Sequence, residues 1–163
     1  MSWAVLSLGS NVGDRTGHLQ TAVHGLGRTV RAVSSIYRTP PWGGVAQPDF
    51  YNIVVIAEDD GIDPRAWWQR CQELERAAGR ERTVRWGPRT LDADVIMVEV
   101  HGQPVISDDP DLILPHPRAA ERAFVLRPWA EVDPTAELPG AGPIADLLEE
   151  LDTAGIARVG HVP

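Results

Sequence analysis

The sequence contains no lysine, and all 15 of its basic residues are arginine. This absence excludes enzymes whose chemistry depends on a lysine side chain, namely P-loop nucleotidases, protein kinases and Schiff-base enzymes. The 23 acidic residues give a formal net charge of −8, which argues against a nucleic acid as partner. Cys71 is the only cysteine, so the fold cannot depend on disulfide bonds, and its place in an apolar helical stripe predicts a core residue.

Long apolar runs are also absent, because no stretch approaches the about 18 residues that a membrane span needs. The first residues lack the basic and apolar pattern of a signal peptide, so we expect a cytoplasmic protein with no membrane partner. A chain of 163 residues has the usual size of one domain, and no repeat or long linker divides it. Residues 1–163 are therefore expected to form a single domain.

Apolar periodicity and turn residues divide the first hundred residues into six regular segments. Strands are expected at residues 3–8, 31–37, 50–57 and 91–98, and helices at residues 14–26 and 63–78. Asp14 and Asp63 supply the helix N-caps, and Gly27 and Gly79 end the helices. The order strand-helix-strand-strand-helix-strand is typical of the ferredoxin-like α+β fold, in which helices cover an antiparallel sheet. We expect a helical C-terminal extension, with helices near residues 118–125 and 144–151 and a short strand near 156–159.

Asp92 and Asp94 are separated by one residue in the last of the four strands, so their side chains leave the same face. Ala93, Val95 and Met97 are then expected to point to the core. Two carboxylates about 7 Å apart along a strand can share hard cations such as Mg²⁺, which also keep water or phosphate oxygens as ligands. The same spacing is equally typical of solvated aspartates on an exposed face, so the spacing alone leaves both interpretations open.

Five arginines fall in one short segment of this acidic chain: Arg76, Arg80, Arg82, Arg85 and Arg89. Guanidinium groups match the geometry of phosphate oxygens and stay charged at any physiological pH. The segment therefore predicts a polyanionic small-molecule ligand next to the aspartate pair. Few apolar side chains anchor residues 80–88, so we expect a loop that is mobile without ligands and closes when they bind.

The stretch from Arg85 to Asp94, RWGPRTLDAD, resembles the signature RWGPRTLDxD of the 6-hydroxymethyl-7,8-dihydropterin pyrophosphokinases, a family of folate-pathway enzymes. Four further motifs of this family occur in the same order, at Gly9–Asp14, Ser35–Pro41, Phe50–Asn52 and Pro115–Phe124. Five ordered motifs make a chance match improbable. Residues 125–163 carry little of the resemblance.

The resemblance implies a ferredoxin-like enzyme that transfers the β,γ-diphosphate of ATP as one unit to the hydroxymethyl group of the pterin and releases AMP. It implies that Asp92 and Asp94 hold two Mg²⁺ ions on the ATP phosphates. It implies that Arg80, Arg82 and Arg89 stabilise the transferred group. The implied ATP-binding residues are Gln72, Glu75, Arg82, Trp86, Arg89, Val95, His116 and Arg122. The implied pterin-binding residues are Thr39, Pro40, Trp42, Phe50, Asn52, Trp86, Asp92 and Phe124.

Phe50 and Phe124 would stack on the two faces of the flat pterin ring, and Asn52 would bind its polar edge. Without the motifs, both phenylalanines would be interpreted as core residues, which is the commoner role of this residue type. Trp42 stands where a smaller aliphatic residue is common in the family, and Asp111 stands where some members have a basic residue.

Two other functions account for part of the pattern. A nucleotide-sugar transferase would explain the aspartate pair, but it would leave the Thr-Pro-Pro and Phe-x-Asn segments without a role. A non-catalytic nucleotide- or pterin-binding module of ferredoxin-like fold would not need both aspartates and three loop arginines together. We therefore expect a monomeric enzyme whose partners are two small molecules, ATP and hydroxymethyl-dihydropterin.

Overall fold

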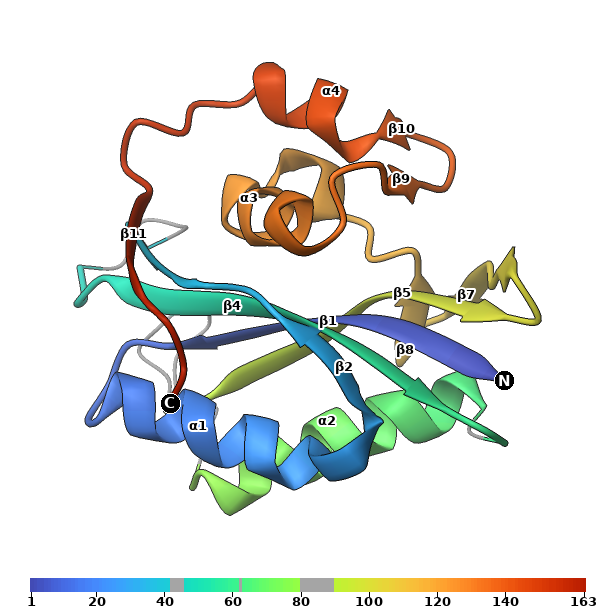
Figure 1. Ribbon diagram of the computed structural model, residues 1–163, viewed down its shortest axis with the longest axis horizontal. Helices are drawn as coiled ribbons and strands as arrows, with labels where there is room; N and C mark the ends of the chain where they lie inside the picture. The colour runs from blue at the N-terminus through green and yellow to red at the C-terminus, as the bar shows by residue number, and fades with distance from the viewer. Residues whose placement is uncertain (42–45, 62, 80–89) are drawn as a thin grey trace.

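The computed structural model describes residues 1–41, 46–61, 63–79 and 90–163. Within these ranges the chain is a mixed α+β protein built on a seven-stranded antiparallel sheet with helices on both faces (Figure 1). The strands lie in the order β11-β3-β4-β1-β5-β6, and β2 also pairs with β4. Their bounds are β1 Ser2–Ser10, β2 Val30–Val33, β3 Ile36–Thr39, β4 Phe50–Asp59, β5 Asp92–Val100, β6 Gln103–Pro104 and β11 Ala157–Gly160.

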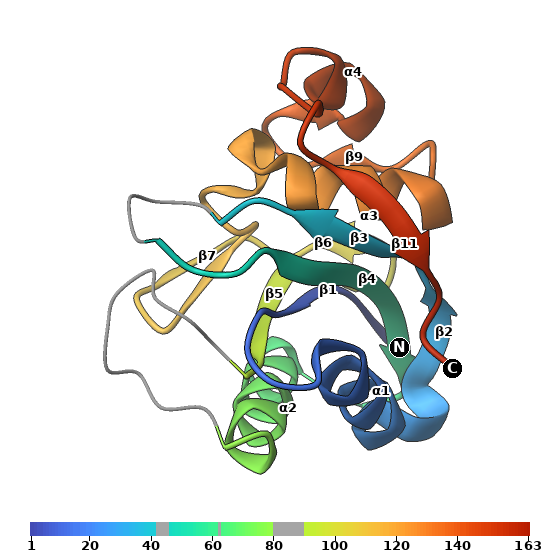
Figure 2. The ribbon, with the colours of Figure 1, turned by 90° about the vertical axis from the view of Figure 1, so that its left-hand side faces the viewer.

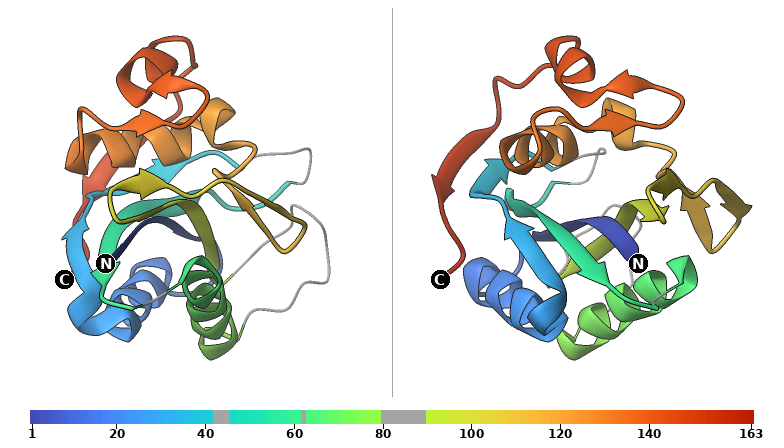
Figure 3. Two further views of the ribbon diagram at one scale, coloured as in Figure 1. Left: turned by 90° about the vertical axis from the view of Figure 1, so that its right-hand side faces the viewer. Right: turned by 45° about the vertical axis from the view of Figure 1, so that its right-hand side comes forward.

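The described helices form two layers. Helices α1 (Arg15–Leu26) and α2 (Pro64–Ala77) cover one face of the sheet, and α3 (Ala123–Val132) and α4 (Ile144–Glu149) lie over the other (Figures 1 and 3). Two small hairpins stand outside the main sheet: β7 (Ser107–Asp109) with β8 (Leu112–Leu114), and β9 (Glu137–Leu138) with β10 (Gly142–Pro143). None of the helices in the described ranges has the length and apolar character that a membrane span requires.

Both predicted N-caps are confirmed. The Asp14 carboxylate accepts the Gly17 backbone N–H over 3.0 Å, and the Asp63 carboxylate accepts that of Ala66 over 2.8 Å. Pro64 occupies the first turn of α2, where its missing N–H removes no intrahelical bond. The caps fix where each helix starts, and therefore which of its faces turns toward the sheet.

The sheet has a core on each side because helices cover both faces. In β1, residues Leu6 and Leu8 pack with Trp67 and Cys71 on the α1–α2 side, and the preceding residue Val5 packs with Trp129 on the α3–α4 side. Cys71 is buried as predicted, and burial raises the pKa of its thiol well above the ordinary value. Strands buried on both faces explain why the central strands are apolar almost throughout rather than alternating.

Two strand predictions need correction. The strand expected over residues 31–37 is divided into β2 and β3 at Ser34 and Ser35. The division arises because the Ser34 hydroxyl accepts the backbone N–H of Val54 over 2.9 Å, and the Ser35 N–H donates to the carboxylate of Glu131. Met97 is buried as predicted, but simple alternation would place it with Ala93 and Val95 in the α1–α2 core, and it lies in the core on the opposite face.

A β-bulge explains the position of Met97. Leu6 pairs with Val95 while Val5 pairs with Met97, so Ile96 is an extra residue in β5. The bulge reverses the alternation, and both Ile96 and Met97 pack into the α3–α4 core. The aspartates precede the bulge, so their predicted common face is unaffected.

The chain after β5 contains more than the two expected helices. The segment predicted as a helix from residue 118 begins as a 3-10 turn at Ala119–Glu121, and α3 starts only at Ala123. The last strand, β11, returns to the sheet and pairs with β3 (Figure 2). The final residues therefore lie beside the Ser35–Pro41 motif, although more than a hundred residues separate them in the sequence.

Candidate functional site

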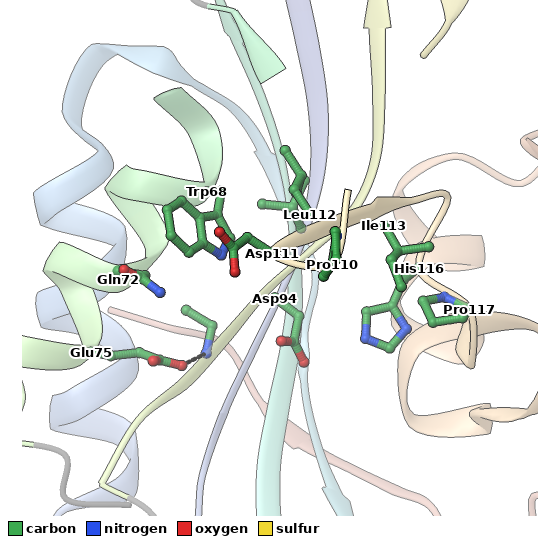
Figure 4. A pocket seen from close by; sticks show the side chains of 12 residues that line it. Trp68, Gln72, Glu75, Asp94, Pro110, Asp111, Leu112, Ile113, His116 and Pro117 are labelled. Atoms are coloured by element: carbon green, nitrogen blue, oxygen red, sulfur yellow. Dashed lines mark hydrogen bonds between the residues drawn. The ribbon is translucent and has the colours of Figure 1, made fainter. Parts of the chain in front are cut away.

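A pocket of about 390 Å³ lies between α2, β5 and the segment around β8 (Figure 4). Gln72 and Glu75 reach it from α2, Asp94 and Val95 from β5, and His116 from the segment that follows β8. All five are residues that the family resemblance assigns to ATP or to Mg²⁺. The fold therefore brings together side chains from three separate parts of the sequence. We call this the first pocket.

Asp92 and Asp94 leave the same face of β5, since both are partly exposed whereas Ala93 between them is buried. The Nη1 atom of Arg122 lies 4.0 Å from Oδ2 of Asp94. The Arg122 side chain is 8% exposed and that of Asp94 is 36% exposed, so a buried cation meets a carboxylate at the rim of the pocket.

The aspartate pair suits a hard cation that also binds oxygen atoms of water or of a bound ligand. Across the described ranges, no three His, Cys, Asp or Glu side chains form a group that could hold a metal ion. A cation bound by Asp92 and Asp94 would therefore take its other ligands from water or phosphate oxygens, which is the habit of Mg²⁺.

Glu75 lies at the back of the pocket and is buried, with 6% of its surface exposed. Its Oε2 accepts the backbone N–H of Ala93 over 2.9 Å (Figure 4). Ala93 is the residue between the two aspartates. The carboxylate of Glu75 therefore ties α2 to the part of β5 that carries the predicted metal ligands.

His116 faces the first pocket as a neutral imidazole. Burial and the nearby Arg122 guanidinium lower its pKa from 6.5 to about 4. Its Nδ1 accepts the backbone N–H of Arg118 over 3.2 Å, so in the neutral ring the proton is on Nε2. His116 thus offers a ligand an N–H donor rather than a positive charge.

The outer wall of this pocket includes Trp68 on α2, which no sequence motif indicated (Figure 4). It also includes Asp111 at the turn of the β7–β8 hairpin, the position where some family members have a basic residue. Arg65 joins the two elements: its guanidinium lies 3.1 Å from Asp109, 3.4 Å from Asp111 and 5.0 Å from the centre of the Trp68 ring. Helical spacing could have indicated Trp68, because it stands four residues before Gln72 on the same face. Nothing local indicates that the hairpin folds over α2.

The predicted pterin-binding residues Thr39 and Asn52 are buried and bonded to each other. The Asn52 Nδ2 donates to Thr39 Oγ1 over 2.6 Å, from β4 to β3. Gly9 on β1 is opposite Asn52, and a side chain at this position would overlap Asn52 Oδ1 and contact Phe50. This close approach is the physical reason for glycine at the first position of the Gly9–Asp14 motif.

Phe50 and Phe124 are both half-buried rather than fully enclosed in the core. Phe50 begins β4, and Phe124 lies in the first turn of α3, where it also packs against the core on that side. A second pocket, of about 360 Å³, lies between the end of β3, the start of α3 and the segment after α4. Thr39, Pro40 and Phe124 line it, and so does Arg122.

Several predicted site residues lie outside the described ranges. They are Trp42, Arg80, Arg82, Trp86 and Arg89, and with them the expected closing loop at residues 80–88. Their roles in ATP and pterin binding stay predictions from the resemblance.

Comparison with known proteins agrees with the motifs. Residues 5–134 match the family model described as 7,8-dihydro-6-hydroxymethylpterin-pyrophosphokinase (HPPK). The 2-amino-4-hydroxy-6-hydroxymethyldihydropteridine pyrophosphokinase of Mycobacterium tuberculosis strain H37Rv is 49% identical, over 94% of this chain and 86% of that protein. The proteins of the same name are 44% identical in Methylorubrum extorquens, over 98% and 99% of the two chains, and 41% in Bacillus subtilis, over 79% and 77%.

Solved structures support the fold. A structure described as HPPK-DHPS in complex with substrates superposes with a TM-score of 0.68 at 12% identity, and another from Plasmodium falciparum with a TM-score of 0.65 at 15% identity. Each match covers over 90% of this chain but only 43% of the solved chain, so this chain spans less than half of those proteins. With the family model and the close relatives, these results show that the chain belongs to the 7,8-dihydro-6-hydroxymethylpterin-pyrophosphokinase family.

Proposed function

We propose that this chain transfers the β,γ-diphosphate of ATP to the hydroxymethyl group of 6-hydroxymethyl-7,8-dihydropterin. The chain is a pyrophosphokinase of folate biosynthesis, as its family and its close relatives are. In this reaction the pterin hydroxyl oxygen bonds to the β-phosphorus, the bond from that phosphorus to the oxygen of AMP breaks, and AMP leaves.

One structural relationship supports this assignment most directly: the ion pair of Asp94 and Arg122 stands between the two pockets. Asp94 lines the first pocket and Arg122 lines the second, and the two side chains meet at 4.0 Å. A diphosphoryl group that passes between two substrates must lie where their sites adjoin. The carboxylate and the guanidinium at this junction are suited to a metal ion and to phosphate oxygens, respectively.

ATP is assigned to the first pocket. Gln72, Val95 and Trp68 would enclose the nucleotide, and the Nε2–H of His116 would donate a hydrogen bond to it. A neutral donor orients an acceptor without adding a charge that must be desolvated. Glu75 has one oxygen committed to Ala93, so its part is chiefly to hold the strand.

Asp92 and Asp94 are assigned to Mg²⁺, with two ions in the complete complex. When bound, these ions would neutralise phosphate charge and align the reacting groups. Arg122, with Arg80, Arg82 and Arg89 from the arginine-rich segment, would stabilise negative charge on the transferred group.

The pterin is assigned to the region of Thr39, Pro40, Asn52, Phe50 and Phe124, with Trp42, Trp86 and Asp92 completing it. The two phenylalanines would cover the faces of the ring. The Asn52 amide, held by Thr39, would pair with the donor and acceptor edge.

We further propose that residues 1–100 form a ferredoxin-like core and that the whole chain is a single monomeric domain of cytoplasmic location. The strand order β3-β4-β1-β5 supports the core assignment. So does the placement of α1 and α2 on one face, α1 after β1 and α2 between β4 and β5. On this view α3 and α4 belong to a C-terminal extension that covers the opposite face.

The test is incubation with ATP, Mg²⁺ and hydroxymethyl-dihydropterin, with AMP and ADP separated by chromatography. We expect AMP in equal amount to the pterin diphosphate, and none without pterin or with excess EDTA. ADP as the nucleotide product would refute diphosphoryl transfer. Pterin binding without any turnover, and with an affinity indifferent to Mg²⁺, would instead indicate a binding module.

A further inference from the structure

The C-terminal strand holds the strand that carries Thr39. In β11, Ala157 pairs with Arg38 and Arg158 pairs with Tyr37. Without β11, strand β3 would be the edge of the sheet, but in the fold it lies between β4 and β11 (Figure 2). The position of Thr39, the last residue of β3, therefore depends on both neighbours.

A close contact joins the segment before β11 to the residue after Thr39. A Cβ atom built on Gly155 would lie 3.1 Å from Cγ and 3.2 Å from Cδ of Pro40. Gly155 does not have a positive φ, so its backbone would accept any residue. The proline ring, rather than the backbone conformation, restricts position 155, because Pro40 would have to shift by a few tenths of an ångström to admit a Cβ atom.

The same segment forms a wall of the second pocket. Leu151, Asp152 and Ile156 line it together with Phe124 and Pro40. The Asp152 carboxylate accepts the backbone N–H of Ala154 over 2.9 Å, which shapes the turn that leads into Gly155. These residues lie beyond the 5–134 range of the family match and beyond every motif of the sequence.

We propose that Leu151, Asp152 and Ile156 are part of the pterin site and that Gly155 is a positioning residue, acting through Pro40 on Thr39 and Asn52. The inference rests on the proposed function, since it takes the pterin to bind beside Thr39 and Phe124. A side chain at position 155 would displace the Pro40 ring, which lines the second pocket. The Thr39 hydroxyl, which receives the Asn52 amide over 2.6 Å, then moves with its neighbour.

The predicted effect is selective for one substrate. Overpacking a tight contact by one to three carbon atoms typically displaces the nearby backbone. We expect Gly155→Val to raise KM for hydroxymethyl-dihydropterin about tenfold, and Gly155→Ala to raise it less. KM for ATP should stay close to that of the wild type, because the first pocket contains no residue of this segment.

The experiment measures both KM values, kcat and the thermal midpoint for the wild type, Gly155→Ala, Gly155→Val and the control Ala154→Val. Ala154 is exposed in the same turn, so the control adds volume without a partner to displace. Pterin affinity is measured separately by fluorescence. If Gly155→Val does not fold, the Gly155→Ala data decide the question.

A second arm asks whether the effect passes through Pro40. In a Pro40→Ala background the ring is gone, so Gly155→Val should change pterin KM much less than in the wild type. Equal effects in both backgrounds, an unchanged pterin KM, or parallel rises in both KM values would overturn the inference. Failure of the wild type to form AMP would refute the proposed function instead, and pterin fluorescence would still test the contact.

Discussion

The carboxylate of Glu75 on α2 accepts the backbone N–H of Ala93 on β5 over 2.9 Å, at the residue between Asp92 and Asp94. A buried carboxylate thus replaces a neighbouring strand as the partner of a strand N–H. The bond holds the aspartate pair at a fixed distance from the helix that also supplies Gln72 to the first pocket.

Replacing Glu75 should lower the stability of the fold. We expect Glu75→Ala to lower the free energy of unfolding by about 1–3 kcal/mol, because the buried Ala93 N–H loses its acceptor. Glu75→Gln keeps a carbonyl oxygen for that bond and should be close to wild type in stability. Urea denaturation measures the difference, and equal losses in the two variants would show that charge rather than the hydrogen bond matters.

Asp92→Asn and Asp94→Asn test the metal assignment with little change in shape. Each should reduce kcat by more than the about 10- to 100-fold that residues supporting a metal ligand typically cause. Each should also raise the Mg²⁺ concentration needed for half-maximal rate. Asp92 is partly exposed, so Asp92→Asn should change the thermal midpoint little. Asp94→Asn also removes the carboxylate that faces the buried Arg122 guanidinium and should lower the midpoint more. Full activity at an ordinary Mg²⁺ concentration in either variant would show that the aspartate it replaces is not a metal ligand.

Phe124→Ala tests the aromatic face offered to the pterin. Loss of ring stacking should weaken pterin binding by about 0.5–1.5 kcal/mol, in addition to the effect of the lost apolar contact area, while ATP affinity is retained. The ring also packs against the α3–α4 core, so some loss of thermal stability is expected as well. A lower thermal midpoint with unchanged pterin affinity would mean that Phe124 is a core residue only.

His116 should make the ligand-free protein less stable in mild acid. Its pKa is about 4 in the folded chain and 6.5 as the ordinary value, so between these pH values the unfolded chain binds the additional proton. The neutral imidazole therefore contributes fully above pH 6.5, and up to about 3 kcal/mol of stability is lost as pH falls to 4. The free energy of unfolding at pH 7 and pH 4.5 should differ less in His116→Asn than in the wild type. An identical pH dependence in both proteins would contradict the assignment.

Much of the fold follows from local sequence. The caps Asp14 and Asp63, the proline after Asp63 and the apolar stripe around Cys71 depend on neighbours within a few residues. The motifs from Gly9 to Phe124 likewise identify the family without any coordinates. The break at Ser34 and the bulge at Ile96 were missed, because each depends on a hydrogen bond or a register with a distant strand.

The sequence by itself determined the two helices of the first hundred residues, the central strands, the family and the carboxylate pair, because these depend on residue type and short spacing. Only the tertiary structure decided that the Glu75 carboxylate accepts the Ala93 N–H, that burial beside Arg122 keeps His116 neutral, and that Gly155 lies against Pro40. Each of these relationships joins residues far apart in the chain. Burial, dielectric environment and close packing arise only when such residues are brought together, so no local pattern contains them.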